Sequence, residues 1–181
     1  MRRLKLSLAA LLGALLLTVV APATAVPLAP VAVSSSATSA AGVASADAAH
    51  RAVTGFRAQS RRDLSGFLAK YGDRLTADQS ARAQALIAGA DLTLAELETK
   101  TGATRALARA GASSARIRRA ANEANLAYDA AAAAATSALA TVQPLLQDRL
   151  SLIEGLQARL ELARSLRAFA DLGAVVKAVR P

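Results

Sequence analysis

The sequence predicts an all-α protein: an antiparallel helical bundle of about four helices that follows a signal peptide and a disordered linker. Alanine supplies roughly a quarter of the chain, which favours helix because Ala has the highest intrinsic helix propensity. Apolar or small residues recur every three or four positions over long stretches, as on one face of a helix. The 181 residues include no Cys, so the core must be held by packing without disulfides.

Residues 1–25 have the three parts of a signal peptide. The basic residues Arg2, Arg3 and Lys5 precede an apolar run over 6–20, and an A-x-A cleavage motif ends at Ala25. That run is about 15 residues long, whereas a helix that spans a bilayer needs about 20. We therefore expect cleavage after Ala25 and a secreted or extracytoplasmic protein. The alternative is that the segment is retained as an anchor.

Residues 26–45 are rich in Ala, Ser and Pro and carry no charge, so we expect a disordered linker. The helical bundle domain then occupies 46–181. The formal charge is +9, of which the signal segment contributes three, so the processed chain keeps +6. A moderate positive charge is compatible with an anionic partner, but it also serves solubility.

The first helix is expected to begin near Ser45, with Asp47 in its first turn, and to end at Gly72 as the C-cap. Its predicted buried face comprises Val53, Phe56, Ser60, Leu64, Phe67 and Tyr71. Thr76 and Gln79 form a capping-box pattern that starts a second helix. Because glycine has a low helix propensity, this helix could break at Gly89. Gly111 is its expected C-cap. The predicted buried face of this helix comprises Ala83, Ile87, Ala90, Leu94, Leu97, Thr101, Thr104 and Ala108.

A third helix is predicted from about 115 to 140, and its apolar stripe comprises Ile117, Ala121, Ala124, Tyr128, Ala131, Ala135, Ala138 and Val142. At the next joint Thr141 could cap a fourth helix with Pro144 in its first turn, or Pro144 could kink one long helix. An unbroken helix over 115–178 would be about 95 Å long, more than the first two helices could cover. The sequence therefore favours a break and four helices.

Beyond the joint, the same stripe is expected to continue with larger side chains into the bundle, namely Leu146, Leu150, Ile153, Leu156 and Leu160. The last segment, 171–181, contains Gly173 and β-branched residues, and we expect it to fray or to cap the end of the bundle.

No arrangement of residues indicates catalysis, and no catalytic, cofactor-binding or metal site is predicted. His50 is the only histidine, and an exposed position near a helix start explains it better than ligation of haem or a metal. Acidic residues are expected to form surface pairs with bases four residues away, as Asp47–Arg51, Glu96–Lys100 and Arg119–Glu123. An enzyme is therefore not expected.

The arginine clusters are the only candidate contacts for an anionic partner. They comprise Arg57, Arg61, Arg62, Arg105, Arg109, Arg116, Arg118 and Arg119. Two pairs, Arg57/Arg61 and Arg105/Arg109, place like charges four residues apart, which is mildly destabilising on a helix. An anionic partner would explain that repulsion, but plain hydration is the simpler explanation.

These features predict a secreted or envelope-associated protein of a non-catalytic, structural or interaction type, with coiled-coil-like packing. The expected partners are a second copy of the chain, giving a homo-oligomer, or an anionic component of the envelope. The alternative is a protein that binds a lipid surface or a small ligand, distantly haem, through amphipathic helices with arginines. Nucleic acid is not an expected partner, because aromatic residues for stacking make up only 3% of the chain.

Overall fold

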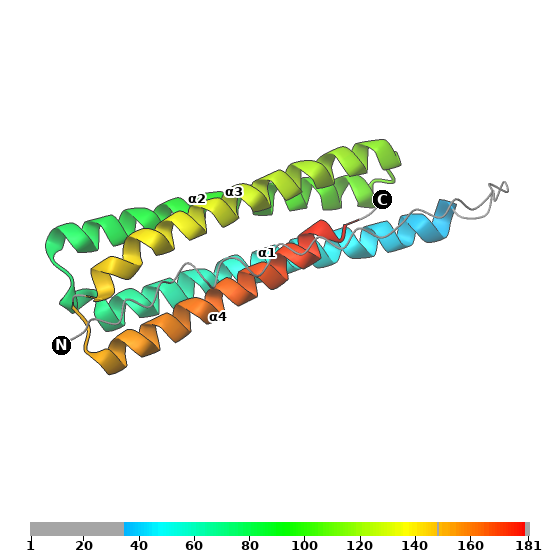
Figure 1. Ribbon diagram of the computed structural model, residues 1–181. Coiled ribbons are helices and arrows are strands. Elements are labelled where there is room, and N and C mark those ends of the chain that lie inside the picture. The colour runs from blue at the N-terminus through cyan, green and yellow to red at the C-terminus, as the bar shows by residue number, and fades with distance from the viewer. Residues whose placement is uncertain (1–34, 148, 180–181) are drawn as a thin grey trace, which may run out of the picture. The chain divides into compact units, whose positions relative to one another are not determined.

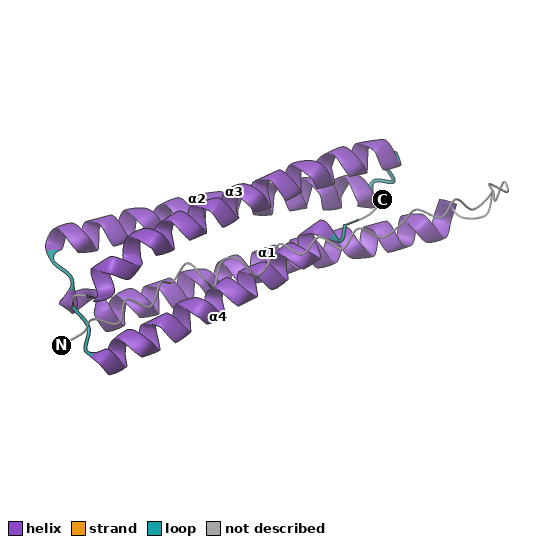
Figure 2. Cartoon of the chain, viewed as in Figure 1, coloured by secondary structure: helices purple, strands orange, loops and turns teal. Residues whose placement is uncertain are grey.

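The computed structural model describes residues 35–147 and 149–179, so the predicted signal peptide and residues 26–34 of the predicted linker lie outside the described residues. The described chain forms four α-helices and one short 3-10 helix. They are α1 (Ser35–Tyr71), η2 (Gly72–Arg74), α2 (Ala77–Arg109), α3 (Ser114–Gln147) and α4 (Leu152–Lys177). The described residues contain no strand (Figure 2), and the predicted all-α antiparallel bundle of four helices is confirmed.

Each helix packs against the next one along the chain, and α4 closes the bundle by packing against α1. Figure 1 shows α2 lying beside α3 and α1 lying beside α4. The chain from Val33 onward forms one compact unit, which contains all four helices and every core cluster described below.

Apolar side chains from all four helices meet in the main core, which includes Val53 of α1, Leu97 of α2, Tyr128 of α3 and Phe169 of α4. A smaller cluster lies near the turn between α2 and α3, where Ala46, Ala108 and Ile117 are buried. A third cluster lies at the other end of the bundle, around Tyr71 and Ala158. The three clusters run along the bundle axis, so packing alone can hold the helices together.

Helix α1 begins at Ser35, ten residues before the predicted start, so residues 35–45 belong to the helix and not to a linker. The hydroxyl of Ser45 donates to the carbonyl of Gly42 inside this helix, and does not cap its start. Ala46 and Ala49, which follow the predicted start, also belong to the buried face and are 1% and 2% exposed. Gly72 does not form a left-handed cap, because the chain continues there into η2.

The start and the end that the sequence predicts for α2 are both confirmed. Thr76 and Gln79 form the reciprocal capping box, and the helix runs unbroken past Gly89 to Arg109. At its other end Gly111 adopts φ of 66°. The amide of Ala112 donates to the carbonyl of Leu107, and the amide of Gly111 donates to that of Ala108. These two hydrogen bonds make a Schellman motif, which ends the helix and turns the chain into α3.

The turn between α3 and α4 lies later than the predicted joint. Pro144 lies inside the last part of α3, and Thr141 donates to the carbonyl of Ser137 instead of capping a helix. The new helix starts at Ser151, which forms a capping box with Glu154. The S-x-x-E pattern was visible in the sequence, and it specifies the start because it satisfies two amide groups at once.

The later turn changes which face of α4 is buried. The predicted apolar stripe is wrong here, since Ile153, Leu156 and Leu160 are 70%, 52% and 60% exposed. The helix instead buries Ala158, Phe169, Leu172, Gly173 and Val176. Residues after 171 therefore belong to the core-facing part of α4, and the prediction that this segment frays is wrong up to Lys177.

Candidate interaction surfaces

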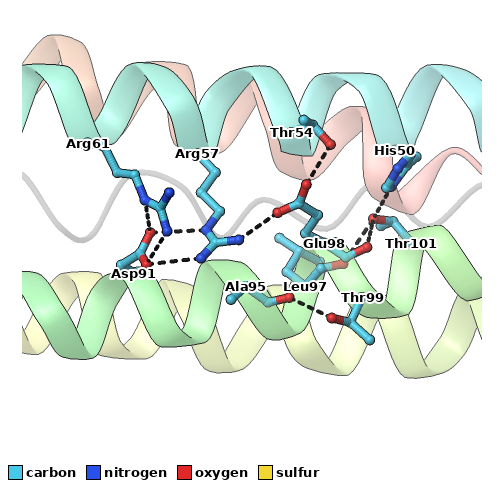
Figure 3. A network of polar contacts seen from close by, with 10 residues as sticks. All are labelled: His50, Thr54, Arg57, Arg61, Asp91, Ala95, Leu97, Glu98, Thr99 and Thr101. Atoms are coloured by element: carbon cyan, nitrogen blue, oxygen red, sulfur yellow. Dashed lines mark hydrogen bonds and ion pairs between the residues drawn. The ribbon is translucent and has the colours of Figure 1, made fainter.

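Two arginines of α1 bind one carboxylate of α2. Arg57 and Arg61 each donate two hydrogen bonds to Asp91, at 3.0 and 3.0 Å and at 2.7 and 2.7 Å (Figure 3). Arg57 also donates to Glu98 at 2.7 Å, and Glu98 accepts from Thr54 at 3.0 Å. Because Arg57 and Arg61 lie four residues apart, both guanidinium groups reach the same side of α2.

The reverse arrangement occurs nearer the start of α1, where two arginines of α2 bind one carboxylate of α1. Arg105 donates to Asp47 at 2.7 Å, and Arg109 donates to both oxygens of Asp47 at 3.0 and 2.8 Å. Each of these two antiparallel helices therefore contributes one arginine pair to one site and one aspartate to the other. We call these two sites the Asp91 clamp and the Asp47 clamp.

The clamps shift the pKa of both carboxyl groups downward. Hydrogen bonds from Arg109 and Arg105 lower the pKa of Asp47 to about 2. Hydrogen bonds from Arg61 and Arg57 hold the pKa of Asp91 well below its usual range. Two cations thus share each carboxylate, which offsets the like-charge repulsion within each arginine pair. No external anion is needed to explain why these four arginines can lie in like-charge pairs.

The other four candidate arginines bind neither Asp47 nor Asp91. Arg62 donates to Gln59 one turn earlier on α1. Arg116, Arg118 and Arg119 are exposed at the start of α3, and none of them forms an ion pair within the described part of the chain. The eight arginines therefore do not form one anion-binding surface.

The three predicted surface pairs within helices are replaced by pairs between helices. Asp47 binds the arginines of α2 instead of Arg51, and Lys100 binds Glu123 of α3 at 3.0 Å. Further cross-helix pairs join Lys70 to Glu161 and Arg74 to Glu154. Ion pairs that link two helices constrain their register, which pairs within one helix cannot do.

His50 is half-buried between α1 and α2, and not exposed as the sequence suggested. Its Nδ1 lies 3.4 Å from the hydroxyl oxygen of Thr101, and its ring lies beside Gly102. Among residues 35–147 and 149–179, no group of three or more His, Cys, Asp or Glu side chains is placed to hold a metal ion. The surroundings of His50 are those of a packed side chain between two helices.

Four exposed, large apolar side chains lie near one another on α4. Leu152, Ile153, Leu156 and Leu160 are 82%, 70%, 52% and 60% exposed. At about 100° per residue they share one arc of the helix, and that arc points away from the buried side that carries Ala158 and Val176. Sequence reasoning missed this surface because it assigned Ile153, Leu156 and Leu160 to the core.

Three exposed arginines surround this apolar arc. By helical spacing Arg159 lies along one border, Arg164 along the other, and Arg167 continues the arc toward the C-terminus. None of the three forms an ion pair within the described residues. We call the four apolar residues and these three arginines the α4 outer face.

The described helices include none that is both long enough and apolar enough to cross a bilayer.

Comparisons with protein-family models, with curated proteins and with solved structures find no match to this chain.

Proposed function

We propose that this chain is a secreted or envelope-associated, non-catalytic protein that works by association, and that the α4 outer face is its contact surface. The observation that carries the proposal is the run of four large apolar side chains, each more than half exposed, on one side of α4. A contiguous exposed apolar surface on a soluble domain usually marks an interaction site.

The core of the bundle gives no reason for these four residues to be apolar. Helix α4 is already held by Phe169, Leu172 and Val176, which are 8%, 5% and 2% exposed. Its start is held by the Ser151 capping box, and its side by the pair between Lys70 and Glu161. Polar residues on the outer face would keep all of these contacts, so the apolar side chains are better explained by a partner.

The export part of the proposal rests on residues 1–25. Their basic start, apolar run and A-x-A motif match a signal peptide, and the chain lacks the cysteines that an oxidising compartment could cross-link. Cell fractionation tests this part directly: the protein should be found outside the cytoplasm with a new N-terminus at Val26. Full-length protein in the cytoplasm would contradict it.

Association is tested by a variant that replaces Leu152, Ile153, Leu156 and Leu160 with glutamine. We expect the wild-type protein to form oligomers in sedimentation velocity, or to co-sediment with isolated envelopes, and the variant to do neither. Both proteins should have the same circular dichroism spectrum, because the replaced side chains are exposed and glutamine is a good helix former.

The matched control replaces Leu92 of α2 and Leu126 of α3, which are 71% and 69% exposed and lie outside the α4 outer face. This control should behave as the wild-type protein does. If the wild-type chain is a monomer that binds no envelope fraction, or if the α4 variant associates as well as the wild type, the proposal is wrong.

A further inference from the structure

We infer that the α4 outer face binds the surface of a lipid bilayer that contains anionic headgroups. The inference rests on the proposed function, since it names the partner of the same surface. It follows from three features of α4: the charge around its apolar arc, the direction in which that arc points, and an excess of arginines that the carboxylates of a second copy could not neutralise.

The α4 outer face contains three arginines and no carboxylate, and the exposed Asp171 lies one turn beyond Arg167. Between Leu152 and Arg167, helix α4 carries only two carboxylates, Glu154 and Glu161. Glu154 is held by Arg74 and by the Ser151 cap, and Glu161 is held by Lys70. None of the three arginines forms an ion pair with a carboxylate of α4 within the described residues. Exposed leucine bordered by arginine is the pattern of a helix that lies in the interface of an anionic membrane.

The direction of the arc lets α4 bind while the bundle stays closed. The four apolar residues lie opposite the buried side of α4, so they can enter the headgroup region without any helix leaving the core. The stretch from 152 to 167 is about 23 Å long and can lie flat on a bilayer. Arginine side chains at its borders are long enough to reach lipid phosphates while their stems remain in the apolar layer.

A second copy of this chain would fit the surface less well. Two α4 outer faces packed together would bring Arg159, Arg164 and Arg167 of both copies to one interface. On each side Glu154 and Glu161 already bind cations of their own chain, which leaves Asp171 alone against three arginines. Like charges across an interface oppose association, whereas lipid phosphates would neutralise all three arginines.

Flotation with vesicles tests the inference. The protein used is the chain from Val26 onward, the form that the proposed cleavage leaves, which contains all four helices and lacks the apolar run at 6–20. Circular dichroism first establishes that this polypeptide is helical and unfolds cooperatively. We expect it to float with vesicles of phosphatidylglycerol and phosphatidylcholine at low salt, to float less at high salt, and not to float with phosphatidylcholine alone.

Two variants separate the apolar and the charged contributions. Leu156→Gln with Leu160→Gln should weaken vesicle binding at least about tenfold, because each leucine loses apolar burial in the interface. Arg164→Gln with Arg167→Gln should weaken it about thirtyfold at low salt, since each arginine near an anionic surface contributes about a factor of five. The matched controls, Leu92→Gln with Leu126→Gln and Arg116→Gln with Arg118→Gln, should bind as the wild type does.

A fluorescent reporter shows which side chains enter the lipid. The chain has no tryptophan, so a single substitution gives an unambiguous signal. The emission of a Leu156→Trp variant should shift to shorter wavelength when anionic vesicles are added. A Leu92→Trp variant should show no shift, because that position is exposed on α2.

The outcomes separate this inference from the proposed function. If no flotation is seen but the chain forms oligomers that the leucine variant abolishes, the lipid partner is wrong and association through α4 stands. If neither occurs, both are wrong. If the arginine variant lowers binding and the leucine variant does not, the partner is a polyanion and not a bilayer, and the inference is overturned. The same holds if only the Arg116 and Arg118 control loses binding.

Discussion

Gly173 of α4 leaves the space that the ring of Tyr128 of α3 occupies. A Cβ atom at position 173 would lie less than 3.0 Å from Cζ, Oη and Cε1 of Tyr128. The hydroxyl of Tyr128 donates to the carbonyl of Phe169 at 3.1 Å, and the two rings stack with centroids 5.0 Å apart. One glycine therefore allows a large side chain of α3 to contact both a ring and the backbone of α4.

We predict that Gly173→Ala lowers the free energy of unfolding by about 1–3 kcal/mol, because the added methyl group forces the Tyr128 ring out of its position. Chemical denaturation followed by circular dichroism measures the change. A Tyr128→Leu substitution in the same chain should recover part of the loss. The matched control is Gly155→Ala on α4, where an added Cβ meets no atom within 4 Å and should raise stability by up to about 1 kcal/mol. Equal effects of the two alanines would contradict the contact.

The Asp47 and Asp91 clamps predict a loss of stability in acid. Both carboxyl groups have a folded-state pKa below the unfolded value of about 3.9, so their stabilisation is complete above about pH 4 and is lost as the pH falls toward 2. The melting temperature should fall over this window. In an Asp47→Asn, Asp91→Asn variant it should be lower at neutral pH and should change less with acid.

The control for this experiment is Asp171→Asn, which removes an exposed carboxylate of α4 that forms no ion pair within the described residues. It should keep the wild-type curve of melting temperature against pH. A double clamp variant with the full acid dependence of the wild type would show that the clamps do not cause it.

The Asp91 clamp also predicts coupling between the two helices that it joins. Asp91→Asn should lower the free energy of unfolding by about 1–2 kcal/mol, since it leaves the charges of Arg57 and Arg61 facing each other on α1. Arg57 and Asp91 side chains are 20% and 26% exposed, so solvent screens them only in part. The double variant Arg57→Gln, Asp91→Asn should cost less than the sum of the two single variants. Additive costs would mean that the pair contributes no interaction energy.

The start of α4 can be tested by removing its cap. Ser151→Ala should lower the free energy of unfolding by about 1 kcal/mol, because Ser151 accepts from the amide of Glu154. Thr141→Ala should have little effect, since Thr141 donates within α3 and begins no helix. Thermal unfolding of the two variants decides between them. A larger loss for Thr141→Ala would place the turn at the joint that the sequence first suggested.

The sequence by itself determined the all-α class, the number of helices and most of the buried faces of α1, α2 and α3. Each of these depends on residues within a few positions of one another. The recurrence of Leu94, Leu97 and Thr101 sets one face of α2, and Thr76 with Gln79 sets where that helix begins. Such local signals do not require knowledge of the partner helix.

The tertiary structure decided the partners of the arginines and the exposed face of α4. Asp47 and Arg109 are 62 positions apart, and their contact depends on how two antiparallel helices align. The turn after Gln147 sets the rotation of α4, and that rotation exposes Leu156 while it buries Phe169. An apolar residue on a helix can face either the core or a partner, and only the packing of the other helices distinguishes the two.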